Sequence, residues 1–159
     1  MRLSLHADYA LRTLMYLAVH DGHRSIGEIA QAYGISKNHL MKVAQRLVAE
    51  GFLVAMRGRS GGLQLARAPD RINVGLVART MEETGSFVEC FNPQTNGCVI
   101  TPACQLRHAL AGGLEAFFRH LDSYSLADLT KDPTAMRESL LIAPSDGAEH
   151  PDTDQEQRQ

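Results

Sequence analysis

The sequence contains no long hydrophobic run. Nothing in its 159 residues approaches the roughly 20 consecutive apolar residues that are needed to span a bilayer. The first residues, MRLSLHADYALRTL, interrupt their apolar segment with Asp8 and Arg12 and lack the hydrophobic centre of a signal peptide. We therefore expect a cytoplasmic protein that has no membrane partner.

The sequence also lacks the motifs of the common enzyme classes. It contains no phosphate-binding loop, no dinucleotide fingerprint and no arrangement of serine, histidine and aspartate that is typical of hydrolases. The three glycines between Gly58 and Gly62 do not form such a fingerprint. We therefore expect a protein that is not an enzyme.

Cysteine is scarce, and its placement is informative. Cys90, Cys98 and Cys104 are the only cysteines, and none of them forms the C-x₂₋₄-C pair of a structural zinc site. An odd number of thiols in a reducing compartment argues against structural disulfides. Longer spacings suit an iron–sulfur cluster, whose iron atoms lie several ångströms apart and prefer thiolates. We predict that the three cysteines bind such a cluster and leave one coordination position to another donor.

Charge is unevenly distributed along the chain. Residues 1–81 contain eleven Lys and Arg against five Asp and Glu, whereas residues 82–159 contain five against thirteen. The net charge of −2 conceals this asymmetry. A basic first half indicates a polyanionic partner, of which nucleic acid is the obvious one.

The first half has the pattern of a helix-turn-helix. Ser25 and Glu28 form a capping box, Gly34 makes the turn, and Ser36 is expected to cap the following helix. The apolar spacing predicts three helices, over residues 5–20, 25–33 and 37–50. Apolar residues of the second helix, the turn and the third helix are expected to close one small core, namely Ile29, Ala30, Ile35 and Leu40.

A basic, glycine-rich turn follows. Two strand-like runs, residues 52–55 and 63–66, flank Met56–Gly62, whose glycines permit positive φ and close approach to a phosphate. Arg57 and Arg59 in this turn suit phosphate oxygens or a minor groove. A helix-turn-helix followed by such a hairpin is a winged helix. The DNA contacts that we predict are Ser36, Lys37, Asn38, His39, Lys42, Arg57 and Arg59.

A long amphipathic helix is predicted in the second half. Thr101 followed by Pro102 is a typical helix start, and the apolar pattern continues to about Leu121. Its apolar residues form a stripe along one face, which serves either dimerisation or packing on the same chain. The stripe consists of Leu106, Leu110, Leu114, Phe117, Phe118 and Leu121. Shorter helices are expected from Val74 to about Glu83, capped by Asn73, and from Ser125 through Leu129.

The sequence therefore predicts a mainly α fold, a winged helix-turn-helix with a two-stranded wing and a long C-terminal dimerisation helix. It divides into a DNA-binding domain (1–83), a cluster-binding segment that we call the cysteine loop (84–104), a dimerisation helix with a C-terminal segment (105–143), and an acidic tail expected to be disordered (144–159).

Four motifs together resemble a known family. They are D-Y-A-L-R from Asp8, G-I-S-K-N-H-L from Gly34, R-G-R-S-G-G from Arg57, and the C-x₇-C-x₅-C loop that ends in I-T-P-A-C. Over residues 1 to about 142 the chain resembles the NsrR family of nitric-oxide-sensing iron–sulfur repressors, within the winged-helix iron–sulfur family that also contains IscR. IscR-like members carry a ligating histidine three residues after the third cysteine. Arg107 stands there in this chain and His108 is one residue late, which favours NsrR.

The resemblance implies a homodimer that binds a palindromic double-stranded DNA operator and crosses through its long helices. It implies a [4Fe–4S] cluster on the three cysteines, with an oxygen ligand from Asp8 of the partner subunit. Nitric oxide would act as the signal, releasing DNA and the genes of the nitrosative-stress response.

Asp8 and the three cysteines also permit other interpretations. Asp8 is also spaced to pair with Arg12 of its own helix, and His108, Glu89, a water or a small thiol are rival fourth ligands. A [2Fe–2S] cluster would indicate an IscR-like regulator of redox or cluster status. A repressor without a cluster would use the three thiols as a disulfide switch.

Overall fold

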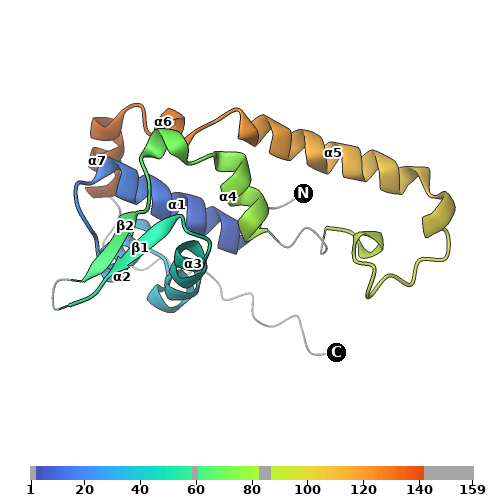
Figure 1. The fold of residues 1–159 in the computed structure, drawn as a ribbon, viewed down its shortest axis with the longest axis horizontal. Coiled ribbons are helices and arrows are strands. Elements are labelled where there is room, and N and C mark those ends of the chain that lie inside the picture. Colours follow the sequence, from blue (N-terminus) through green and yellow to red (C-terminus); the bar gives the residue numbers. More distant parts are fainter. Residues whose placement is uncertain (1–2, 59–60, 83–86, 142–159) are drawn as a thin grey trace.

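Helices dominate the structure, a computed structural model that describes residues 3–58, 61–82 and 87–141 (Figure 1). The helices are α1 (Leu5–Val19), α2 (Ile26–Tyr33), α3 (Lys37–Ala49), α4 (Val74–Met81), α5 (Gln105–Asp122), α6 (Leu126–Leu129) and α7 (Pro133–Leu141). Strands β1 (Leu53–Met56) and β2 (Gly62–Leu65) form an antiparallel pair. The predicted mainly α winged helix with its two-stranded wing is confirmed. Within the described ranges, no helix has the length and apolarity to cross a membrane.

Local signals set the helix-turn-helix. Ser25 and Glu28 form the predicted capping box at the start of α2, with both reciprocal hydrogen bonds present. Gly34 ends α2 with φ of +63°, a conformation that glycine adopts without a steric penalty. Ser36 occupies the predicted N-cap position of α3, but its hydroxyl accepts no hydrogen bond from the helix. The side chain of Ser36 is instead exposed.

One core lies beneath α1, α2, α3 and the wing. Ile29, Ala30 and Leu40 are buried, and Ile35 packs against this cluster from the turn. The small core that the sequence predicts is thus confirmed, and each large side chain buried there contributes about 1.5–3 kcal/mol. It fixes α3 relative to α2 and leaves the first turn of α3 on the surface.

The wing requires its glycines for two different reasons. Gly58 has φ of +120°, which side-chain-bearing residues rarely adopt. Gly61 and Gly62 do not have positive φ, contrary to expectation. They are needed because a Cβ would lie 2.5 Å from the Met56 carbonyl oxygen at Gly61, and 2.7 Å from that of Arg24 at Gly62. Close packing of the backbone therefore shapes most of this turn.

Two elements of the second half differ from expectation. The long helix starts at Gln105, because Thr101–Ala103 forms a separate 3₁₀ turn and Cys104 is extended at φ −79° and ψ 107°. Helix α7 was not predicted, although the pair Asp132 and Pro133 is a helix-start signal. The Ala135 amide donates to the Asp132 carboxylate at 3.0 Å. The predicted tail (144–159) lies outside the described residues.

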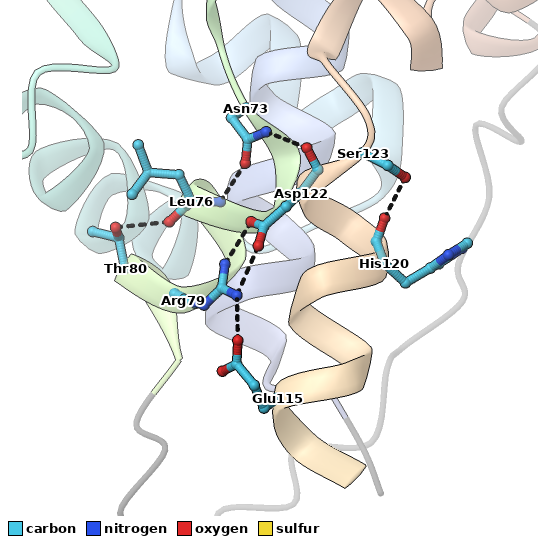
Figure 2. Close-up of polar contacts among 8 residues, drawn as sticks. All are labelled: Asn73, Leu76, Arg79, Thr80, Glu115, His120, Asp122 and Ser123. Carbon is cyan, nitrogen blue, oxygen red and sulfur yellow. Dashed lines mark hydrogen bonds and ion pairs between the residues drawn. The ribbon is translucent and has the colours of Figure 1, made fainter. Parts of the chain in front are cut away.

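A polar junction fastens the C-terminal half of α5 to α4 (Figure 2). The Arg79 guanidinium donates to both carboxylate oxygens of Asp122 at 2.5 and 2.8 Å, and lies 3.5 Å from Glu115. This pairing lowers the pKa of Asp122 and raises that of Arg79. Arg79 also lies 5.0 Å from the ring centroid of Phe118, the one residue of the predicted stripe that is buried among those described.

The other half of α5 projects from the body. In Figure 1 it runs past the end of α4 and carries the cysteine loop outside the outline of the winged helix. Leu106 near its start is 65% exposed. The junction at Arg79 therefore determines where the cysteine loop lies relative to the winged helix.

Replacing Gly75 tests this junction. A Cβ there would clash with the Asp122 carboxylate and lie 2.7 Å from its backbone nitrogen, so Gly75→Ala should lower the free energy of unfolding by about 1–3 kcal/mol. Urea unfolding measures the change. Gly27→Ala in α2 is the control, because its Cβ meets only ordinary contact at 3.8 Å. Equal stability of both variants would contradict tight packing of α5 on α4.

Candidate metal centre and nucleic-acid interface

The first turn of α3 presents polar side chains to solvent. Ser36, Lys37, Asn38, His39 and Lys42 are all exposed, whereas Leu40, Val43 and Ala44 on the other face are buried. Within the described part of the chain, no hydrogen bond or ion pair ties up the side chains of Lys37, Asn38, His39 or Lys42. The arrangement leaves donors and positive charge available at the end of a helix that is held by its opposite face.

The wing adds a further cation. Arg57 follows β1 at the start of the turn and is exposed. Arg59, the other predicted contact of the turn, lies outside the described residues. Its neighbour Gly58 has no side chain, and no described atom lies within 4 Å of where a Cβ would stand, which suits close approach of a phosphate.

The three cysteines occupy three different local structures. Cys90 lies in the short 3₁₀ turn Glu89–Phe91, Cys98 in an irregular segment, and Cys104 at the N-terminal cap of α5. All three are free thiols. Cys98 is exposed, whereas Cys90 and Cys104 are half-buried. The Cys104 sulfur accepts the Arg107 amide at 3.4 Å, so the thiol itself caps the helix.

Hydrogen bonds brace the loop between the cysteines. The Glu89 carboxylate accepts the Gly97 amide at 2.7 Å, which draws the neighbourhoods of Cys90 and Cys98 together. The Asn96 side chain accepts the Cys98 amide at 3.1 Å, and the Thr101 hydroxyl donates to the Cys98 carbonyl at 2.8 Å. Glu89 is one of the rival fourth ligands that the sequence suggests. In this structure its carboxylate instead makes a hydrogen bond within the cysteine loop.

The first turn of α5 adds a contact that the sequence did not indicate. The Arg107 Nε donates to the Cys90 carbonyl at 3.2 Å, across 17 residues of chain. Cys90 and Cys104 therefore contact the same residue. His108, the other rival ligand, is exposed on the same turn.

The three cysteines are not gathered into one closed site in the described part of the chain. Among the described residues, no three His, Cys, Asp or Glu side chains are gathered closely enough to hold a metal ion. The loop nonetheless offers three free thiols, with backbone amides around them, on a segment short enough to close. Thiolates are the ligands that iron–sulfur clusters prefer, so ligation of a cluster by these three cysteines stays a prediction.

Asp8 lies in the first turn of α1, on the winged helix rather than on the loop. Its carboxylate pairs with Arg12 one turn later, at 2.9 Å from Nη2 and 3.0 Å from Nε. In the single chain, Asp8 therefore forms the ion pair with Arg12 of its own helix that the sequence indicates as the alternative. The Arg12 guanidinium also lies 5.9 Å from the ring centroid of Tyr33, at the end of α2. Ligation of a partner's cluster by Asp8 stays a prediction.

Comparison with known proteins places these features in a family. Residues 3–132 match the model of Rrf2, described as an iron-dependent transcriptional regulator. The chain is 46% identical over 143 residues to the HTH-type transcriptional regulator NsrR of Geobacillus kaustophilus, covering 89% of this chain and 97% of that protein. It is 46% identical over 134 residues to NsrR of Bacillus subtilis, covering 83% and 92%. The sequence-based preference for NsrR is confirmed.

Solved structures agree on the fold. The chain resembles T. potens IscR with a TM-score of 0.65 and 27% identity, over 86% of this chain and 91% of that one. It resembles CymR, the global cysteine regulator of B. subtilis, with a TM-score of 0.62 and 26% identity, over 82% and 97%. The curated relatives are named as transcriptional regulators, which are not enzymes.

Tyr33 provides a pH test of the packing beside Arg12. Burial raises the pKa of Tyr33 to about 12, and its hydroxyl has no hydrogen-bond partner in the described ranges. Because the folded-state pKa lies above the unfolded value, the associated stability is complete below about pH 10 and is lost as pH rises toward 12. At pH 11, the free energy of unfolding of the Tyr33→Phe variant should therefore have fallen by about 1 kcal/mol less than that of the unsubstituted chain.

Urea unfolding between pH 9 and pH 11.5 checks this expectation. Tyr124→Phe, at an exposed tyrosine, is the control and should follow the unsubstituted chain. Parallel loss of stability in the chain with and without Tyr33→Phe would contradict a buried phenol at this position.

Proposed function

Because the chain belongs to the Rrf2 family of iron-dependent transcriptional regulators, we propose that it is an iron–sulfur repressor that senses nitric oxide. In this proposal it acts in the cytoplasm, where it binds an operator and releases genes of the nitrosative-stress response when the cluster is nitrosylated. The names of its relatives support transcriptional regulation. The nitric-oxide signal and the [4Fe–4S] cluster are our inference from the cysteine loop and from the similarity to NsrR.

One structural relation carries the proposal. Cys104 caps the N-terminal end of α5. The hydrogen bonds from Arg79 to Asp122 hold the C-terminal half of the same helix to the winged helix. A change in the cysteine loop therefore acts at the N-terminal end of α5, while the C-terminal half of the same helix is held against the winged helix. Rigid secondary structure of this kind can couple two distant sites when it has two arrangements.

DNA recognition is assigned to α3 and the wing. A homodimer would place two α3 helices in successive major grooves of a palindromic operator, about one helical turn apart. Asn38 has the donor and acceptor to read adenine, while Lys37 and Lys42 suit guanine or phosphate. Arg57 and Arg59 would hold the backbone or enter the minor groove beside the site.

Exposed apolar residues support a second copy of the chain as the partner. Val99 is 91% exposed beside Cys98, and Leu106 on α5 is 65% exposed. Large apolar side chains at this exposure, on a projecting helix and its loop, favour burial in an interface. In the proposed dimer this interface lies along α5 and brings each cysteine loop to the partner's α1.

The fourth ligand in the proposal is Asp8 of the partner subunit. When bound, the [4Fe–4S] cluster supplies iron that reacts with nitric oxide, and Cys90, Cys98 and Cys104 hold it. In the single chain the Asp8 carboxylate pairs with Arg12, so it has a local partner whenever it is not a ligand. Exchange between these two partners would alter the contact between subunits and, through it, the relative placement of the two α3 helices.

A thiol switch is the second candidate, and the exposed Cys98 favours it. It would join two of the three thiols in a disulfide on oxidation by peroxide. An IscR-like [2Fe–2S] regulator is the other alternative. These functions share the winged helix and differ in what the cysteines hold.

The absorption spectrum of anaerobically purified protein, together with its iron and sulfide content, tests the proposal. We expect a brown protein whose broad visible absorbance changes on addition of nitric oxide. Four iron and four sulfide per chain identify a [4Fe–4S] cluster, and two of each identify a [2Fe–2S] cluster. A colourless protein that binds DNA and responds only to peroxide would show that the thiol switch is correct.

Arg57→Ala tests the wing. Loss of one phosphate contact should weaken operator binding about three- to tenfold at moderate salt and reduce the salt slope by about one. Fluorescence anisotropy at several salt concentrations measures both. Arg119→Ala, at an exposed arginine of α5, should leave the slope unchanged. A slope that Arg57→Ala does not alter removes Arg57 from the interface.

A further inference from the structure

Arg107 occupies an unusual place in the cysteine loop. Its backbone amide donates to the Cys104 sulfur at 3.4 Å, and its side-chain Nε donates to the Cys90 carbonyl at 3.2 Å. The first bond closes one turn of α5, whereas the second spans 17 residues of chain. Two of the three cysteines are therefore bound to a single residue, Cys104 through its sulfur and Cys90 through its backbone carbonyl.

The Arg107 side chain has no evident structural role elsewhere. It is half-buried, and among the described residues no carboxylate forms an ion pair with it. Arg79 of the α4–α5 junction, in contrast, pairs with two carboxylates. A guanidinium cannot ligate iron because it stays protonated and has no free lone pair to offer. Its contribution must come through hydrogen bonds and charge.

Hydrogen bonding to a carbonyl is the contribution that the geometry specifies. Cys90 lies in the 3₁₀ turn Glu89–Phe91. A charged donor makes a stronger hydrogen bond than a neutral one, and this bond joins the turn to the start of α5. The remaining thiol, Cys98, is braced separately by Asn96 and Thr101.

We propose that Arg107 is a positioning residue of the cysteine site. Its side chain holds the Cys90 turn against the N-terminus of α5, so that Cys90 and Cys104 form a preorganised pair of thiols before metal arrives. Cys98, which is exposed and is held by its separate hydrogen bonds, then completes the set of three thiols. The inference rests on the proposed function in one respect, namely that these thiols are cluster ligands.

Thiol cross-linking of the metal-free full-length chain tests this pairing. A Cys98→Ser background leaves Cys90 and Cys104 as the only thiols. Dibromobimane becomes fluorescent when each of two thiolates displaces one bromide from it, so fluorescence reports a bridged pair. Bridging within one chain is confirmed by a product of monomer mass in denaturing electrophoresis.

Two substitutions separate the hydrogen bond from the charge. Arg107→Gln keeps an N–H donor at the same distance along the side chain as Nε but removes the charge. Arg107→Met has a similar length and has neither donor nor charge. Arg119→Ala removes an exposed charge from the same helix and serves as the control for α5.

We expect Arg107→Met to slow cross-linking about tenfold, as loss of one charge-assisted hydrogen bond implies. Arg107→Gln should recover most of the rate, and Arg119→Ala should leave it unchanged. No cross-link in the Cys98→Ser parent, or equal rates in the Gln and Met variants, would overturn the proposal. Because the assay contains no metal, its outcome is independent of whether the protein senses nitric oxide.

The same substitutions with Cys98 intact connect the bond to the cluster. After anaerobic reconstitution, Arg107→Met should retain less iron and sulfide than Arg107→Gln. Equal retention would contradict a role of this bond in holding the cluster. If none of the variants, nor the unsubstituted chain, takes up iron, the proposed function fails while the cross-linking result stands.

Discussion

The bidentate pair between Arg79 and Asp122 is the contact on which the arrangement of this protein depends. It fixes the C-terminal half of α5 to α4, with Glu115 and the ring of Phe118 beside the same guanidinium. Isolated surface ion pairs contribute little, but this one is bidentate and lies over a buried aromatic ring. With one half held, the other half of α5 carries the cysteine loop away from the body (Figure 1).

The same junction is connected to α3, the helix that we propose to read DNA. The Arg46 guanidinium near the end of α3 donates to the Thr80 carbonyl of α4, one residue from Arg79. At the same end of α4, the carboxylate of the C-cap residue Glu82 accepts the Ser4 amide at 2.6 Å, beside the start of α1. Helix α4 thus contacts α3, the helix that carries Asp8 and the helix that Cys104 caps. These contacts connect α5 to α3 through α4.

Much of the fold could be predicted from local signals, because caps, glycines and apolar periodicity act over a few residues. The capping box at Ser25, the turn at Gly34 and the paired strands of the wing are examples. The start of α5 could not, because Thr101 and Pro102 look like a helix start and only the extended backbone at Cys104 separates them from it. The contact of Arg107 with Cys90 was also missed, since it depends on how the loop folds back, which no spacing encodes. The cysteines themselves were evident from composition.

We propose that the state of the cysteine site controls DNA binding. Stepwise addition of nitric oxide to anaerobic holoprotein, with absorbance and anisotropy of a labelled operator recorded on the same sample, measures this coupling directly. We expect operator affinity to fall in proportion to the loss of intact cluster, by about five- to 150-fold at completion. Unchanged affinity after the cluster absorbance is lost would contradict it.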